Sequence, residues 1–203
     1  MKKYAVLHEP GDIVTLAGTR FVVLDVERRG SLPDSLFLLA LESVGASEFG
    51  SSNNYAESDL KKAVDKWLED MGKRGLDNAK LIPREIDLTT LDGSGCYGKL
   101  SVKAAPLTLD EAREYADIIP NAERWCWLAT GWSGPSKSDG DLALYVRSNG
   151  GWDYNGCSNS CGIRPALKIP SDLLLDSADK PDLSEVPTDT LLEEIRRRVV
   201  DKA

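Results

Sequence analysis

The sequence of this 203-residue chain predicts an α+β fold. Three observations lead to this prediction. Strand-like runs of β-branched and apolar residues occupy the first forty positions, apolar residues recur at helical spacing in two later stretches, and short strand-like segments alternate with polar loops from Trp125 onward. We expect these elements to form one domain over residues 1–175, because this length suits a single domain with a sizeable core.

The first forty residues are expected to contribute three strands. Residues 13–16 and 19–26 are rich in β-branched side chains and flank a turn at residues 17–18, so they predict a hairpin. Residues 35–41 form a short, continuous apolar run, which predicts a buried strand. Residues 43–56 are rich in Gly, Ser and Asn and are expected to form a loop.

Two helices are expected in the middle of the chain. The first has apolar residues every three or four positions and ends at Gly72. Its apolar positions are Leu60, Val64, Trp67, Leu68 and Met71. The second begins at Thr108, whose hydroxyl can cap the backbone N–H of Glu111, and continues through Ala112 and Tyr115.

The remaining elements of the domain are short. Residues 81–88 are expected to be extended and residues 93–95 to form a loop. Further strands are predicted at residues 125–130, 142–147, 151–154 and 163–169. This alternation of short strands and loops is the least regular part of the sequence.

The C-terminal residues are expected to lie outside this domain. Residues 176–189 carry five acidic side chains, one lysine and two prolines, which predicts an exposed acidic linker. Thr190 and Glu193 then form a second capping-box pattern for an amphipathic helix over residues 190–203. A helix of this length needs a surface to pack on, so we expect it either to dock on the domain or to bind a partner or a second copy of the chain.

The charge balance excludes two classes of partner. Lys and Arg total 25 and Asp and Glu total 33, a formal net charge of −8, so the chain lacks the basic footprint of nucleic-acid-binding and anionic-lipid-binding proteins. The N-terminal segment is too polar for a signal-peptide core, and no apolar run reaches the length of a membrane span. We therefore expect a protein that is cytoplasmic as synthesised, without a nucleic-acid or membrane partner.

Cysteine and histidine are too few, and too scattered, to suggest a cofactor or a resident metal. Cys157 and Cys161 are the only close pair, whereas Cys96 and Cys126 are isolated, so the two paired sets typical of zinc sites are missing. His8 is the only histidine, and nothing in the sequence pairs it with a nucleophile. Phosphate-loop and dinucleotide-binding motifs are also missing.

The most informative segment is residues 125–169. It holds six of the eleven Trp and Tyr residues among many Ser, Asn, Gly and Asp residues: Trp125, Trp127, Trp132, Tyr145, Trp152 and Tyr154. Rigid rings combined with adaptable polar groups are typical of recognition surfaces, although core aromatic residues next to ordinary loops would give the same composition. We expect Trp125 and Trp127 to be core residues and residues 152–155 to lie in a recognition loop.

Several motifs in the chain resemble a family of bacterial and phage domains. The segment Trp127-Leu128-Ala129-Thr130 and the closing segment Gly162-Ile163-Arg164-Pro165-Ala166-Leu167 match the two most specific motifs of that family. The opening hairpin that begins at Pro10-Gly11-Asp12 and the helix that begins at Ser58-Asp59-Leu60 fit more loosely. The resemblance covers residues 10–170.

This resemblance implies a C-type-lectin-like fold, with two helices around small twisted antiparallel sheets and long irregular loops. Proteins of this fold include the variable proteins of diversity-generating retroelements and the formylglycine-generating enzymes. In the variable proteins, ligand-facing residues precede the closing strand. The corresponding residues here are Tyr145, Arg147, Asn149, Trp152, Asp153, Tyr154, Asn155, Cys157, Asn159 and Cys161.

The expectation that follows is a non-enzymatic protein of bacterial or prophage origin that binds a protein or glycan ligand through residues 142–161. It would meet that ligand in a phage particle or after release from the cell. The motifs of calcium-dependent lectins are represented only by Glu9-Pro10 and Trp152-Asp153, at the wrong places, so calcium-dependent sugar binding is not expected. Two alternatives remain open: a metal- or thiol-dependent enzyme related to the formylglycine-generating type, with Cys157 and Cys161 as its reactive pair, and a structural phage component.

Overall fold

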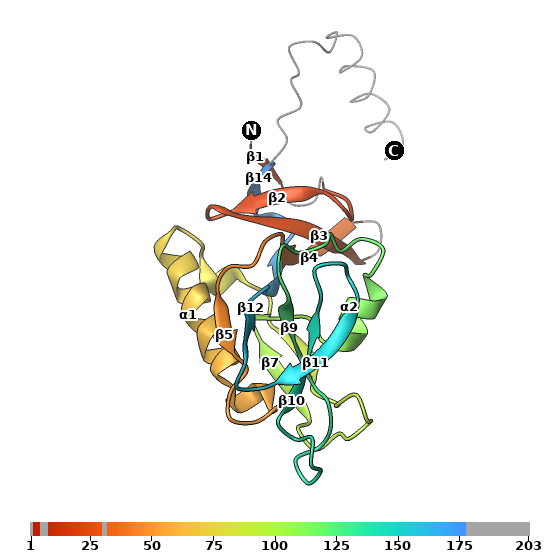
Figure 1. Cartoon of the computed structure of the whole chain (residues 1–203). Coiled ribbons are helices and arrows are strands. Elements are labelled where there is room, and N and C mark those ends of the chain that lie inside the picture. The colour runs from red at the N-terminus through yellow and green to blue at the C-terminus, as the bar shows by residue number, and fades with distance from the viewer. Residues whose placement is uncertain (1, 5–7, 30–31, 178–203) are drawn as a thin grey trace, which may run out of the picture.

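The computed structural model describes residues 2–4, 8–29 and 32–177 (Figure 1). These residues contain a seven-stranded sheet, a five-stranded sheet, a two-stranded ribbon and two α-helices. The architecture is therefore mixed α+β, as the sequence predicts. Residues 178–203, with the predicted C-terminal helix and most of the predicted acidic linker, lie outside the described residues. The first two residues of that linker belong to the last described strand.

The seven-stranded sheet combines the N-terminal strands with the last strands of the domain. Its strand order is β1 (Lys2–Tyr4), β14 (Leu174–Ser177), β2 (Ile13–Leu16), β3 (Thr19–Arg29), β4 (Leu32–Ala40), β13 (Ala166–Pro170) and β8 (Ala104–Ala105). All of its pairings are antiparallel. The predicted closing strand, β13, thus lies beside β4 inside the sheet and not at its edge.

The five-stranded sheet contains most of the aromatic segment. Its order is β11 (Trp152–Gly156), β10 (Leu142–Val146), β9 (Cys126–Gly131), β12 (Ser160–Gly162) and β5 (Ala46–Glu48). The ribbon pairs β6 (Arg84–Asp87) with β7 (Lys99–Val102). Figure 1 shows α1 (Asp59–Lys73) and α2 (Leu109–Glu114) on opposite sides of the strands. Two short 3₁₀ helices, η2 (Tyr55–Glu57) and η3 (Asn78–Lys80), flank α1 in the sequence.

The predicted N-terminal hairpin and buried strand are confirmed. Ala17 and Gly18 both have positive φ angles, 48° and 77°, as a two-residue hairpin turn requires. Both faces of β3 and β4 are covered, because neighbouring residues such as Val22 and Val23 belong to two different core clusters. Burial on both faces explains why residues 36–40 of β4 are continuously apolar instead of alternating.

The two predicted helices are also confirmed, with one corrected boundary. All five predicted apolar positions of α1 are buried, and Ser58 caps its first turn by accepting a hydrogen bond from Lys61 N (2.9 Å). Gly72 does not end α1: the helix runs to Lys73, and Gly75, with φ of +100°, follows its cap. In α2 both halves of the predicted capping box are present, between Thr108 and Glu111.

Three predictions, one of a loop and two of strands, need correction. Residues 43–56, expected to be a loop, contain β5 and the start of η2, because β5 pairs with β12 far along the chain. The strand predicted at residues 163–169 is divided, since β12 ends at Gly162 and β13 begins at Ala166. Residues 163–165 therefore pass from one sheet to the other. The strand β9 begins at Cys126, so Trp125 precedes it.

Candidate functional site

Exposed aromatic side chains gather around one hairpin of the five-stranded sheet. Among the described residues the exposed large apolar side chains are Leu91, Trp125, Trp152 and Tyr154, and the three aromatic ones are 49%, 46% and 47% exposed. Val146 of β10 is paired with Trp152 on one side and with Cys126, the neighbour of Trp125, on the other. Trp152 and Tyr154 therefore lie on β11, and Trp125 directly precedes β9, with β10 between these two strands.

The β10–β11 hairpin divides the predicted ligand-facing residues between two faces of the sheet. Successive side chains of a strand point to opposite faces, so Trp152 and Tyr154 lie on one face of β11, and Asp153 and Asn155 lie on the other. Tyr145, which is paired with Asp153, shares the second face. The ten predicted residues are thus not a single surface.

On the second face, Trp125 covers Tyr145. The two rings are stacked, with centroids 5.0 Å apart and an interplanar angle of 21°, and the rings of Tyr145 and Trp127 meet edge-on at 6.3 Å. Tyr145, predicted as ligand-facing, is only 4% exposed. Trp125, predicted as a core residue, is the half-exposed one, whereas Trp127 is buried as expected. The correction for Trp125 follows from its position ahead of β9, where no further strand covers it.

An ion pair lies next to this stack. Arg147 Nη2 donates a hydrogen bond to Asp153 Oδ2, and the hydroxyl of Tyr145 lies 3.5 Å from the same oxygen. The hydrogen bond from Arg147 holds the pKa of Asp153 below its usual range, since it stabilises the carboxylate form. The pair therefore presents a fixed charge of each sign at the edge of the aromatic stack.

Asn155, Asn159 and Cys161 continue the same face. Asn159 Nδ2 donates to Asn155 Oδ1 at 2.8 Å, and Asn155 Nδ2 lies 3.8 Å from Cys161 Sγ. Cys157 and Cys161 are both buried, free thiols, and burial raises the pKa of each, that of Cys157 to about 12. Neither thiol is therefore ionised near neutral pH, and neither has the exposed, electropositive setting of a reactive cysteine.

A shallow groove of about 400 Å³ runs beside Trp125 and is called the Trp125 groove below. Its polar lining consists of Glu123, Arg124, Ser148 and Ser160, all of them exposed, with Cys161 and Ala46 beside them. The groove combines an aromatic platform with hydrogen-bond donors and acceptors of both charges. Residues 123–125, β12, β5 and the turn after β10 meet there.

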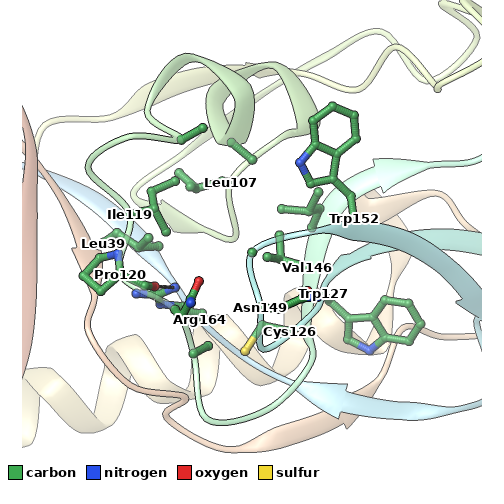
Figure 2. A pocket seen from close by; sticks show the side chains of 16 residues that line it. Leu39, Leu107, Ile119, Pro120, Cys126, Trp127, Val146, Asn149, Trp152 and Arg164 are labelled. Carbon is green, nitrogen blue, oxygen red and sulfur yellow. Dashed lines mark hydrogen bonds between the residues drawn. The ribbon is translucent and has the colours of Figure 1, made fainter.

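The first face of the hairpin borders a second, more apolar cavity of about 290 Å³, called the Trp152 cavity (Figure 2). The guanidinium of Arg113 from α2 lies 4.6 Å from the centroid of the Trp152 ring, a cation–π contact that links helix and hairpin. Tyr154 lies against Trp132, with centroids 4.4 Å apart. Asn149 lies in the hairpin turn, where its Oδ1 accepts a hydrogen bond from Gly151 N at 3.1 Å.

Arg164 from the closing motif lines the Trp152 cavity. It is 6% exposed, and it donates from Nε to Ala40 O (2.7 Å) and from Nη1 to Pro120 O (2.9 Å). Its Nη2 has no hydrogen-bond partner among the described residues. Burial lowers the pKa of the Arg164 guanidinium from its usual value, although a guanidinium stays charged at physiological pH.

Sequence reasoning missed Arg113, Arg124, Ser148, Ser160 and Arg164 as candidate site residues. Arg164 was visible as part of the closing motif, but its place in a cavity wall depends on strands of two sheets. Within the described part of the chain, no three His, Cys, Asp or Glu side chains converge as a metal site would require.

Among the described residues, no helix combines the length and the apolar character that crossing a bilayer would need. Comparisons of this chain with protein-family models, with curated proteins and with solved structures give no match.

Proposed function

We propose that this protein is a non-enzymatic recognition module that binds a glycan or protein ligand in the Trp125 groove. The observation that carries this proposal is the half-exposed indole of Trp125, held parallel to a buried tyrosine ring above a groove of polar side chains. The exposed half of a large aromatic ring adds no burial to the fold, whereas a rigid exposed ring offers contact area to a ligand at little entropic cost.

The groove supplies the polar part of such a contact. Glu123 accepts hydrogen bonds, Arg124 donates them, and the Ser148 and Ser160 hydroxyls do both. A ring platform beside groups of this kind suits a sugar, which has an apolar face and a rim of hydroxyls. It also suits an aromatic or polar side chain of a protein partner.

The thiols support the non-enzymatic part of the proposal. An enzyme of the formylglycine-generating type needs reactive cysteines, and Cys157 and Cys161 are buried with raised pKa values. The Trp125 groove brings together a carboxylate and a guanidinium, but it contains no activated nucleophile with a positioned base.

The finer identity is part of the same proposal. We infer a C-type-lectin-like fold from the two helices, the small antiparallel sheets and the closing strand β13, and a bacterial or prophage origin from the motif resemblance. A ligand surface next to the closing motif fits the variable proteins of diversity-generating retroelements. The observed surface includes Trp125, however, which lies well before residues 142–161.

The test is binding of the purified chain to a panel of immobilised glycans and, in parallel, to a displayed peptide library. We expect Trp125→Ala to weaken binding at least about tenfold, a loss of about 1.4 kcal/mol. The matched control is Leu91→Ala, which removes an exposed apolar side chain outside the groove and should leave binding unchanged.

The two ligand classes give different outcomes. Binding to glycans alone would make the module a lectin in function, and binding to peptides alone would make it a protein receptor. Binding that survives Trp125→Ala, or the lack of any Trp125-dependent ligand in both panels, would overturn the proposal. Particle association without either ligand would favour a structural phage component instead.

A further inference from the structure

The Trp152 cavity lies on the opposite face of the β10–β11 hairpin from the Trp125 groove and shares no lining residue with it. Its walls come from the end of β4, from α2 with the segment that follows it, and from β9 and β10. Figure 2 shows Leu107 and Ile119 on one side of this space and Val146 on the other, with Trp152 at its edge. A volume of about 290 Å³ is near the lower end of small-molecule pockets.

Arg164 is the one charged residue among those that line this cavity. Its hydrogen-bond partners, Ala40 O and Pro120 O, are neutral carbonyls, and none of the described carboxylates lies within ion-pair distance of it. Glu42 interacts with it electrostatically, but Glu42 forms its ion pair with Arg20. A buried guanidinium whose hydrogen-bond partners are all neutral is costly, since the desolvation of its charge is not offset by a directly paired carboxylate.

The remaining polar groups of the cavity do not provide that opposite charge. Asn121 and Asn149 are neutral, exposed amides. Burial raises the pKa of the Cys126 thiol to about 11, so this side chain is also neutral near physiological pH. The cavity therefore combines apolar walls, one buried cation and one guanidinium nitrogen, Nη2, without a partner.

We propose that the Trp152 cavity binds a small monocarboxylate with an apolar body. The carboxylate would pair with the charge of Arg164 and accept a hydrogen bond from Nη2, while Nε and Nη1 keep their bonds to Ala40 O and Pro120 O. The apolar body would occupy the space between Leu107, Ile119 and Val146. Inorganic phosphate would satisfy the charge but leave the apolar walls unfilled, and a nucleotide is too large for the volume.

The experiment uses the full chain and three probes: phenylacetate, its neutral isostere phenylacetamide, and inorganic phosphate. Binding is followed by calorimetry and by the NMR signal of the Trp152 indole N–H, since Trp152 borders the cavity. We expect phenylacetate to bind and to shift this signal, and phenylacetamide to bind at least about tenfold more weakly. Phosphate is expected to leave the Trp152 signal unchanged.

Two substitutions localise the binding without removing Arg164, which also braces two backbone carbonyls. Ala116→Trp places a large ring at an exposed position of the cavity wall and should weaken phenylacetate binding at least about tenfold. Ala46→Trp, the matched control, fills the Trp125 groove and should leave phenylacetate binding unchanged. Because the two variants act on separate sites, failure here is distinguishable from failure of the glycan or protein ligand test.

Four results would overturn the proposal. Equal affinity for phenylacetate and phenylacetamide would show that the charge of Arg164 is not recognised. Unchanged phenylacetate binding in Ala116→Trp, or no Trp152 shift with any carboxylate, would show that the cavity is not the site. A Trp152 shift with phosphate but not with phenylacetate would replace the apolar carboxylate with an inorganic anion.

Discussion

The indole of Trp125 lies nearly parallel to the ring of Tyr145, with 5.0 Å between the ring centroids. Trp127 also meets this tyrosine edge-on, and Phe49 in turn meets Trp127 edge-on at 5.5 Å. Trp125 is thus the outermost member of an aromatic chain that reaches into the core. This explains how a half-exposed side chain can be held rigidly enough to act as a binding platform.

Trp125 and Trp127, the two tryptophans of this aromatic series, should differ strongly in their effect on stability. Trp125→Ala removes one stacked contact and should lower the free energy of unfolding by about 0.5–1.5 kcal/mol. Trp127→Ala empties a buried site and should cost about 3–5 kcal/mol. Urea unfolding of both variants measures the difference, and equal losses would show that Trp125 is a core residue after all.

Thiol reactivity should distinguish Cys96 from the other three cysteines. Cys96 is exposed, whereas Cys126, Cys157 and Cys161 are buried with pKa values raised by burial. In the native protein at about pH 8 we expect one thiol to react rapidly with a disulfide reagent, and all four to react after denaturation. Cys96→Ser should abolish the fast reaction. Fast labelling of Cys157 or Cys161 would instead favour the thiol-dependent enzyme.

The ion pair of Asp153 should make a pH-dependent contribution to stability. Arg147 lowers the pKa of Asp153 in the folded state, so the contribution is present above the unfolded pKa of about 3.9 and is lost as the pH falls through the lower folded value. We expect Asp153→Asn to lower the urea midpoint near neutral pH, and the difference from the parent protein to vanish in strong acid. In an Arg147→Gln background, Asp153→Asn should have little effect at either pH; a full effect there would contradict the pairing.

The capping box of α2 should be measurable in isolation. Thr108 Oγ1 accepts from Glu111 N at 3.2 Å, and Glu111 Oε2 accepts from Thr108 N at 2.8 Å. Thr108→Ala removes the first of these bonds and should cost about 1 kcal/mol in thermal or urea unfolding. Thr108→Ser retains the acceptor and should recover most of the loss. No recovery with serine would mean that the packing of the threonine methyl group dominates.

Gly162 of the closing motif should not tolerate a side chain. A Cβ atom there would lie 2.8 Å from Ser43 Oγ, 2.9 Å from Arg124 Cδ and 2.9 Å from Cys126 Sγ. We expect Gly162→Ala to destabilise the fold by about 1–3 kcal/mol through overpacking. Gly95→Ala is the control, because no atom lies within 4 Å of its added Cβ, and it should change stability by less than about 0.5 kcal/mol. Equal midpoints for the two variants would contradict this packing.

Part of the candidate site was within reach of sequence reasoning. Residues 151–154 were expected to be a strand, and alternation along a strand already places Trp152 and Tyr154 on the face opposite Asp153. The expectation of a single recognition loop over residues 152–155 does not agree with this alternation. The exposure of Trp125 had no such signal, because a tryptophan two residues before another one reads equally well as part of a buried strand face.

The sequence by itself determined the features that depend on neighbouring residues. The apolar face of α1, the capping box of α2 and the Ala17-Gly18 turn involve residues no more than a few positions apart, so propensity and spacing reveal them. The α+β class follows from the same local signals.

Only the tertiary structure decided how distant segments meet. The indole of Trp127 donates to Ser47 O across 80 positions, and Arg164 donates to Ala40 O across 124. Contacts of this kind place β5 in the five-stranded sheet and put a buried cation in the wall of the Trp152 cavity. The free energy of such a contact depends on both segments together. The sequence of either segment alone does not show which partner it will have.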